Sequence, residues 1–271
     1  MRPPGVAVSM ASVRLWKPAP ACSIFSSQDA ALAGSDPRPW LLLADGAGSS
    51  AVSELGARGV VSGLNCLLHT LDRQVATLLD AEQTPAPEEG RRLALLLVKH
   101  ARGLLADLAA EHRRPLKDFR CTLLLAIPGQ RHLLWLKIGD GALVIERTQA
   151  AAAPGREQPA GLETLGRAGK GEFANQTTFV DEQLQPDDVQ SGLLSMEGIG
   201  GVALMSDGAA DRLVSRDGRQ VSGQLGQWFQ ALREGRLKRR GLTQRFYAED
   251  FTDKTGGDDC SITLTARPLR P

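Results

Sequence analysis

The stretch from Trp40 to Glu54, WLLLADGAGSSAVSE, constrains this chain more than any other. A short apolar run ends at Asp45-Gly46, small residues follow, and a helical pattern then begins. Such a run predicts a buried strand, and its end would present the Asp45 carboxylate. Gly46 and Gly48 carry no side chain, so a ligand or a metal ion could approach the main chain there. We therefore expect a functional loop between this strand and the following helix.

The same loop admits a second interpretation, because residues 46–51 fit the dinucleotide fingerprint G-x-G-x-x-G/A. A dinucleotide-binding unit needs strand, helix and strand within about 30 residues, with an acid about 20 residues after the glycines. Here one helical pattern covers Ser53 to Asp80 and a second covers Glu88 to Glu111 before any strand. The acid at a suitable distance, Asp72, lies inside the first helical pattern. The order of elements therefore favours an acid that binds metal.

The N-terminal part predicts further strands. Val6 to Trp16 alternates between apolar and polar residues, and another strand begins near Asp29. The link from Gly34 to Pro39 has the composition of a turn. The strand beginning at Asp29 and the strand ending at Asp45 should therefore pair antiparallel, because a parallel crossover needs a dozen residues or more.

The second half predicts more short strands and two helices. Three apolar runs separated by glycine-containing turns predict an antiparallel meander; they are Cys121–Ile127, His132–Ile138 and Ala142–Glu146. Ala150 to Gly171 is expected to be a loop. Further strands are predicted at Thr177–Asp181, Gly201–Ser206 and Cys260–Ala266, and helices at Val221–Arg233 and Leu242–Tyr247.

Composition excludes several classes of protein. The 271 residues include 32 basic and 31 acidic ones, so the net charge of +1 gives no field for nucleic acid or an acidic membrane. No apolar run approaches the roughly 20 residues of a membrane span, and the N-terminus lacks a signal-peptide core. The four cysteines are scattered, as expected of free thiols in a reducing cytosol. We expect a single cytoplasmic domain, 1–271, that binds neither nucleic acid nor membrane.

Four acidic residues share one local pattern. Asp45, Asp140, Asp207 and Asp258 each lie at the edge of a predicted strand with a glycine close by. Carboxylates that converge without basic partners repel one another, and a divalent cation is the usual remedy. Oxygen ligands suit magnesium or manganese, and no cluster of Cys and His suggests zinc. The pattern predicts a metal site.

Five short motifs, in order, resemble those of the type 2C metal-dependent protein Ser/Thr phosphatases, especially the compact bacterial branch of the family. The resemblance covers nearly the whole chain. It implies an α+β fold, in which an antiparallel β-sandwich is flanked by helix pairs on both faces. The motifs are Gln28-Asp29-Ala30, Ala44–Gly48, Ile138–Gly141, Ala203–Gly208 and Asp258–Thr263.

The resemblance also implies a metal centre made of acids. Asp45 would bridge two ions and the carbonyl of Gly46 would bind one of them, while Asp207 and Asp258 would complete the site. These three acids are the catalytic candidates, since the family uses no nucleophilic side chain. Asp29 would hold a metal-bound water from outside the ligand set.

The implied cofactors are two Mn²⁺ or Mg²⁺ ions, with a third, weaker ion at Asp140. The implied reaction is hydrolysis of phosphoprotein monoesters at serine and threonine by attack of a metal-activated water. A phosphorylated protein would be the substrate, a Ser/Thr kinase its cognate partner, and the phosphatase itself a monomer.

Two departures from the family pattern concern the substrate. Eukaryotic members have a histidine, proposed as the general acid, where this chain has Ala47. They also have a phosphate-binding arginine where this chain has Ile24, and Arg14, Lys17 or Arg58 are the candidate replacements. His69 is a candidate for the missing acid. These departures keep open the alternative of a catalytically weak phosphatase-like module that binds a regulatory or phosphorylated partner.

Overall fold

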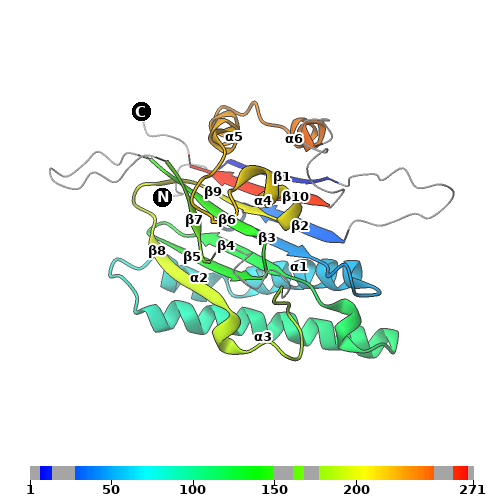
Figure 1. The fold of residues 1–271 in the computed structure, drawn as a ribbon. Coiled ribbons are helices and arrows are strands. Elements are labelled where there is room, and N and C mark those ends of the chain that lie inside the picture. Colours follow the sequence, from blue (N-terminus) through cyan, green and yellow to red (C-terminus); the bar gives the residue numbers. More distant parts are fainter. Residues whose placement is uncertain (1–6, 14–27, 149–160, 168–176, 247–258, 268–271) are drawn as a thin grey trace.

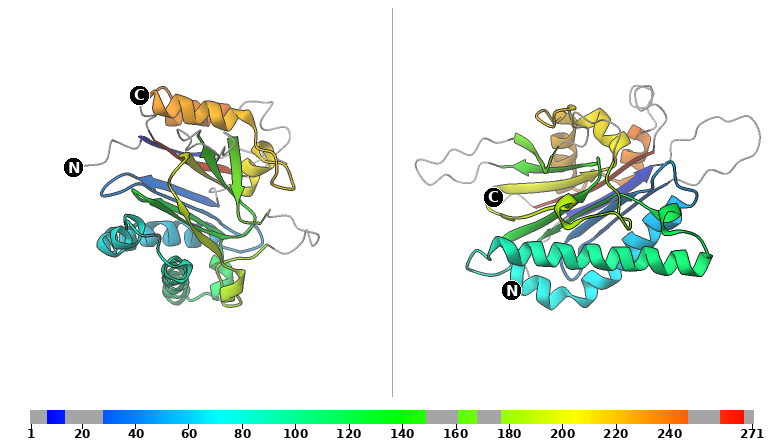
Figure 2. Two further views of the ribbon diagram at one scale, coloured as in Figure 1. Left: turned by 90° about the vertical axis from the view of Figure 1, so that its left-hand side faces the viewer. Right: turned by 60° about the horizontal axis from the view of Figure 1, so that its bottom comes forward.

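The computed structural model describes residues 7–13, 28–148, 161–167, 177–246 and 259–267. These residues form two antiparallel five-stranded sheets, which lie face to face between two layers of helices (Figures 1 and 2). The predicted fold class is confirmed. Because every strand pair is antiparallel, the dinucleotide-binding alternative is wrong.

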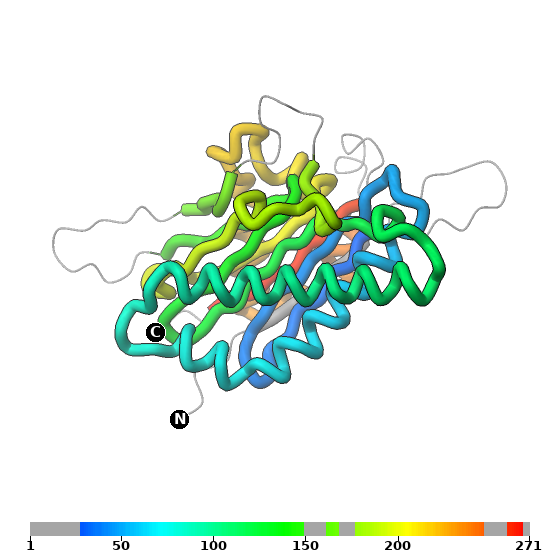
Figure 3. The backbone as a smooth tube through the Cα atoms, turned by 90° about the horizontal axis from the view of Figure 1, so that it is seen from below, coloured from blue at the N-terminus to red at the C-terminus, as the bar shows by residue number. Residues whose placement is uncertain are grey.

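The first sheet contains the stretch that ends at Asp45. Its strand order is β2 (Asp29–Gly34), β3 (Trp40–Asp45), β4 (Leu123–Pro128), β5 (His132–Ile138) and β8 (Gln190–Ser195). Three helices cover its outer face, with α1 and α3 running across the strands (Figure 3). They are α1 (Ser53–Thr70), α2 (Asp72–Leu79) and α3 (Pro87–His112), and the 3-10 turns η1 (Leu116–Phe119) and η2 (Pro186–Asp188) lie in the connections.

The second sheet is built largely from the C-terminal half. Its strand order is β1 (Ala7–Val13), β10 (Cys260–Ala266), β9 (Ile199–Met205), β6 (Ala142–Arg147) and β7 (Gly161–Leu165). The helices packed on it are α4 (Asp207–Leu213), α5 (Gly223–Arg233) and α6 (Arg239–Phe246). None of the helices described has the length and apolar character that a membrane span requires.

Alternating side chains divide the interior into three hydrophobic layers. In β3, Leu42 and Ala44 pack towards α1 and α3, whereas Leu41 and Leu43 point into the layer between the sheets. This alternation is the two-residue period of a strand. Both faces of the strand are buried, which explains its continuous apolar run. The third layer lies between the second sheet and helices α4–α6.

Several local predictions need correction. The meander is wrong for its third strand, because β6 leaves the first sheet and pairs with β7 and β9. The crossing begins at Gly139, whose φ of +106° suits glycine alone. Ser53 to Asp80 is two helices that meet at Leu71. Residues 177–181 form only an isolated bridge, from Val180 to Cys121. The sequence analysis missed β7, β8 and α4.

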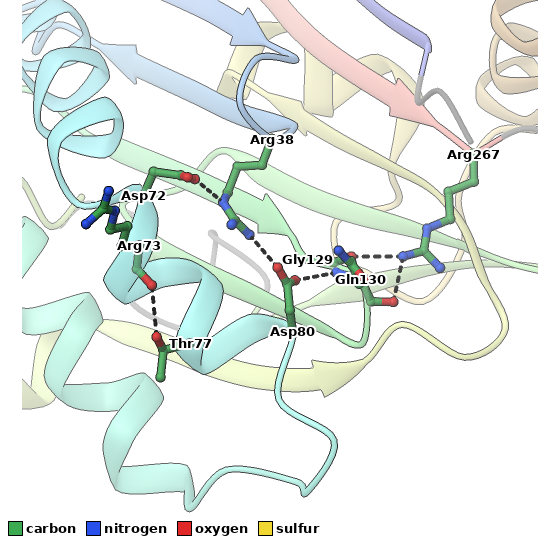
Figure 4. Close-up of polar contacts among 8 residues, drawn as sticks. All are labelled: Arg38, Asp72, Arg73, Thr77, Asp80, Gly129, Gln130 and Arg267. Atoms are coloured by element: carbon green, nitrogen blue, oxygen red, sulfur yellow. Dashed lines mark hydrogen bonds and ion pairs between the residues drawn. The ribbon is translucent and has the colours of Figure 1, made fainter. Parts of the chain in front are cut away.

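A network of ion pairs and hydrogen bonds connects the two sheets at the end of the first sheet where β3 begins. Arg38 pairs with Asp72 at 2.6 Å and with Asp80 at 3.4 Å. Asp80 also accepts a hydrogen bond from the backbone N–H of Gln130 at 2.7 Å. Arg267, just after β10, donates to the carbonyl of Gly129 at 2.9 Å (Figure 4). The network joins α2, the β4–β5 turn and the second sheet.

Candidate metal centre

Asp29 and Asp45 are paired residues at the opposite end of the first sheet. Asp29 begins β2, Asp45 ends β3, and the two are direct partners in the antiparallel register. Two residues away along each strand, Ala31 and Leu43 pack in the layer between the sheets. Strand alternation therefore points both carboxylates into the sandwich. The sheet brings together two acids that are 16 positions apart.

Asp207 reaches the same region from the second sheet. It is the first residue of α4, separated from the end of β9 by Ser206, and its Oδ1 accepts a hydrogen bond from the N–H of Gly208 at 2.6 Å. Its charge acts on Asp45, as does that of Asp140 in the turn between β5 and β6. Asp140 accepts a hydrogen bond from Thr177 Oγ1 at 2.8 Å. Both sheets thus supply acids to one end of the interior.

Burial makes the Asp29 carboxyl hard to ionise. It is 5% exposed, and burial raises its pKa to about 7, an effect that Asp45, Ser261 and Ser206 partly oppose and the Asp259 carboxylate reinforces. Those side chains lie close enough to influence Asp29. Even so, neither of its carboxylate oxygens has a hydrogen-bond partner of ordinary geometry among the described residues. A buried oxygen without a partner is costly unless something binds it.

The pKa of Asp45 is raised well above its usual range. Burial is the largest cause, followed by the negative charges of Asp29 and Asp207. In the described part of the chain, neither Asp29, Asp45 nor Asp140 forms an ion pair. Carboxylates arranged in this way favour either protonation or a bound cation.

The loop after Asp45 packs closely on α1 and on the segment before β4. A Cβ on Gly46 would lie 2.8 Å from Ser53 Oγ, so only glycine lets the end of the strand approach the helix this closely. The N–H of Ala47 donates to the carbonyl of Arg120 at 3.1 Å, and Ala47 is buried. The position of the family's histidine is therefore buried, and its N–H is bonded to the segment before β4.

The last acidic motif is described only in part. Asp258 lies outside the described residues, so the structure does not place it. Its neighbour Asp259 accepts a hydrogen bond from the N–H of Gln28 at 2.9 Å, next to Asp29. Asp259 therefore has the position of a supporting hydrogen-bonding residue, and the choice of Asp258 as a ligand stays a prediction.

The structure places only some of the candidates for the missing general acid and the missing phosphate-binding cation. His69 packs edge-on against Trp40, with ring centroids 6.3 Å apart, so it lies near the opposite end of β3 from Asp45. Arg58 is exposed on α1. Ile24, Arg14 and Lys17 lie outside the described residues.

The sequence analysis overlooked two cations near this end of the molecule. Lys137 is buried in β5, where the signal was a charge in an otherwise apolar strand. Arg120 donates to Ser49 Oγ at 2.8 Å and to Ser50 Oγ at 3.1 Å, and its guanidinium lies 5.0 Å from the ring centre of Phe179. Only the fold shows that both residues lie next to segments of the site.

The donor set fits a hard divalent cation. Asp29, Asp140 and Asp207 all act on Asp45, and among the described residues neither oxygen of Asp29 has a hydrogen-bond partner of ordinary geometry. Oxygen ligands of this kind suit Mg²⁺ or Mn²⁺. Within the described residues, no three acids, histidines or cysteines are already arranged as a set of metal ligands. The fit to a divalent cation therefore rests on the negative charges that converge on Asp45.

Comparison with protein families decides the family. Residues 25–244 match the family model described as Protein phosphatase 2C, a match that includes Asp29, Asp45, Asp140 and Asp207. This chain belongs to the protein phosphatase 2C family. A comparison with curated protein sequences finds no match.

Solved structures of protein phosphatase 2C proteins share the fold over nearly the whole chain. The serine/threonine phosphatase PstP/Ppp of Mycobacterium tuberculosis has 15% identity and a TM-score of 0.61, with 98% of this chain and 100% of that one covered. Serine-threonine phosphatase 2C from Toxoplasma gondii has 13% identity and a TM-score of 0.63, with 97% and 95% covered. The catalytic domain of PstP in complex with two manganese ions has 15% identity and a TM-score of 0.57, with 97% of each chain covered.

Proposed function

We propose that this protein is a metal-dependent phosphatase that hydrolyses phosphoserine and phosphothreonine monoesters in proteins. The observation that supports the proposal is the convergence of inward-facing acids, from both sheets, at one end of a protein phosphatase 2C fold. The fold relative PstP is described with two manganese ions. We infer that two Mn²⁺ or Mg²⁺ ions bind here as well.

Each acid has a proposed role at this site. The charges of both Asp29 and Asp207 act on Asp45, which suits a ligand shared by two ions. Asp207 and Asp258 would complete the pair together with the carbonyl of Gly46. When bound, the ions would lower the pKa of water and offset the negative charge of the phosphoryl oxygens.

Two further acids would act around that pair. The buried oxygens of Asp29 would orient a water beside the ions by hydrogen bonds. Asp140, held by Thr177 in the β5–β6 turn, would contribute to a third and weaker ion. Neither role requires a nucleophilic side chain.

The reaction consumes one water for each phosphoryl group. A water oxygen forms a bond to phosphorus, the bond from phosphorus to the serine or threonine oxygen breaks, and the products are the alcohol and inorganic phosphate. The departing oxygen needs a proton. Ala47 cannot supply it, and His69 lies beside Trp40 near the other end of β3. We propose that water supplies this proton.

The absence of a histidine at Ala47 predicts a preference among substrates. A nitrophenolate leaves without protonation, whereas a serine alkoxide needs it, and a positioned general acid typically contributes roughly 10²–10⁴-fold. This protein should therefore favour aryl phosphates over phosphoserine peptides more strongly than relatives with the histidine. Ala47→His is expected to be a poor rescue, because Ala47 is buried and a larger side chain would overpack the loop.

The test is hydrolysis of nitrophenyl phosphate and a phosphoserine peptide with manganese, with and without a chelator. Manganese-dependent turnover of both substrates would support the proposal. Tight manganese binding without turnover of either would instead support a phosphatase-like module that binds a phosphorylated or regulatory partner. A phosphorylated protein and the Ser/Thr kinase that modifies it are the proposed physiological partners.

A further inference from the structure

A pocket lies directly beside the acids of the proposed metal centre. It is bounded by the ends of β5, β6 and β7 and by α4, and both Asp140 and Asp207 line it. Its volume is about 50 Å³, which is room for about three or four waters. A third acid, Asp211, and three cations, Lys137, Arg167 and Arg216, line the same pocket.

Lys137 is the buried member of this group. It is 3% exposed, whereas Arg167 and Arg216 are exposed. Along β5, Leu133 and Trp135 pack in the layer between the sheets, so strand alternation points Lys137 inwards as well. Its side chain therefore enters the interior from the same sheet, and at the same end, as Asp29 and Asp45.

The ammonium group of Lys137 has unused hydrogen-bonding capacity. Among the described residues its one hydrogen bond goes to the carbonyl of Arg167, at 2.8 Å. An ammonium has three donors. Asp140 attracts the charge of Lys137, but the two groups do not form an ion pair within the described structure. A buried ammonium without a paired anion is costly.

A purely structural role would explain only part of this arrangement. The backbone of Arg167 is held on two sides, because its N–H donates to Gln190 Oε1 at 2.6 Å while Lys137 binds its carbonyl. A neutral donor could hold that carbonyl as well as an ammonium does, without burying a charge. The positive charge therefore calls for a further explanation, and the adjoining pocket provides one.

We propose that the ammonium of Lys137 binds an oxygen of the substrate phosphoryl group in this pocket, as the cation that replaces the arginine absent at Ile24. The inference rests on the proposed function and adds the residue that recognises the phosphate. With cations bound to Asp140 and Asp207, the positive charges of Lys137, Arg167 and Arg216 in the pocket outnumber the one remaining negative charge, that of Asp211. That arrangement suits a phosphate dianion held between the ions and Lys137.

The test measures binding of inorganic phosphate by calorimetry, in the presence of manganese, to wild-type protein, Lys137→Met and Gln190→Leu. Loss of a charge-assisted hydrogen bond predicts that Lys137→Met binds phosphate about 10- to 100-fold more weakly. Manganese affinity should stay the same within about threefold. Gln190→Leu is the matched control, because it removes the other tie to Arg167 and leaves the charge. It should bind phosphate as the wild type does.

Three results would overturn the inference. They are wild-type protein that binds no phosphate, Lys137→Met that binds it within threefold of wild type, and Gln190→Leu that loses as much affinity as Lys137→Met. If Lys137→Met does not fold, as judged by circular dichroism, Lys137→Gln takes its place, because it removes the charge but keeps a donor for the Arg167 carbonyl.

Hydrolysis of nitrophenyl phosphate is measured separately on the same proteins, so the two ideas can fail independently. A wild type that binds phosphate through Lys137 but does not hydrolyse the ester would leave this inference standing and remove the proposed function. Wild-type protein that hydrolyses the ester but binds phosphate independently of Lys137 would leave the proposed function standing and remove this inference.

Discussion

The two ends of the first sheet use the same residue type in opposite ways. Where β3 begins, Asp72 and Asp80 share the guanidinium of Arg38. Where β3 ends, Asp29 and Asp45 face each other across the register, and neither forms an ion pair in the part of the chain that the structure describes. Arg38 and Asp45 lie near the two ends of β3, which is roughly 20 Å long from one to the other.

The difference between the ends shows what a paired and an unpaired acid can do. At the Arg38 end, one guanidinium offsets part of the negative charge of Asp72 and Asp80, and these contacts hold α2 and the β4–β5 turn in place. At the Asp45 end, burial raises the pKa values of Asp29 and Asp45, and nearby negative charges add to it: that of Asp259 for Asp29, and those of Asp29 and Asp207 for Asp45. Such a site is unfavourable until a cation binds, and perturbed carboxyl groups of this kind are typical of functional sites.

The largest expected effect is on activity, which a substitution at the Asp45 end should lower and one at the Arg38 end should not. Asp45→Ala should lower kcat/KM for nitrophenyl phosphate by about 100-fold or more, because the stabilisation that metal ions give to the transition state is worth several kcal/mol. Asp72→Ala, at the other end, is the control and should keep near wild-type kcat. Retention of a tenth of wild-type turnover by Asp45→Ala at saturating manganese would contradict its assignment as the shared ligand.

The next effect concerns the two adjacent acids of the last motif. Asp258→Asn should raise the manganese concentration needed for half-maximal activity by about 100-fold. Asp259→Asn should raise it by about 10-fold, at the lower end of what supporting residues contribute. Asp259 is bonded to the backbone of Gln28 beside Asp29, so its effect should be indirect. The reverse ranking in a metal titration would assign the ligand to Asp259.

A pH titration compares the cations of the two ends. Burial lowers the pKa of Lys137 to about 8, although Asp140 partly opposes the shift. Below pH 8 both folded and unfolded chains hold the proton, and the full cost of burial is present. Between pH 8 and about 10.5 the unfolded chain holds more protons than the folded one, so the free energy of unfolding should rise with pH.

The expected rise is about 2–3 kcal/mol, measured by urea denaturation of the metal-free protein. Lys137→Met should lack this rise. The difference between the two proteins therefore separates the contribution of Lys137 from that of other titrating groups. Arg38→Met should keep the rise, because it leaves Lys137 in place. Equal pH dependence in wild type and Lys137→Met would show that the ammonium stays hydrated in the folded protein.

The smallest expected effect is on stability: substitutions at the two ends should change the free energy of unfolding in opposite directions. In the presence of a chelator, Asp45→Asn should increase the free energy of unfolding by about 1–2 kcal/mol, because the amide neither buries a negative charge nor has to take up a proton on folding. Asp72→Asn should decrease it by about 1–2 kcal/mol, because it removes a charge-assisted hydrogen bond to Arg38. Urea denaturation of both variants at pH 7 measures the comparison. Destabilisation of the metal-free protein by Asp45→Asn would mean that the carboxylate is already compensated.

The sequence by itself determined the features that depend on local pattern. The apolar run of β3, the two long helical stretches after it and the acid-glycine steps at Asp45, Asp140 and Asp207 are all visible in short windows. Strand alternation and helical periodicity arise from backbone geometry, which acts over a few residues. The same motifs identified the family, and with it the α+β sandwich.

Only the tertiary structure decided which distant residues meet. The sequence analysis expected β6 to continue the first sheet, but the turn at Gly139 sends it into the second. Arg38 finds Asp72 and Asp80 across 34 and 42 positions, and Lys137 enters a pocket with Asp207, which comes from the other sheet. Whether an acid is paired or left for a metal depends on such contacts. They form only when the sheets pack, so no local sequence pattern can specify them.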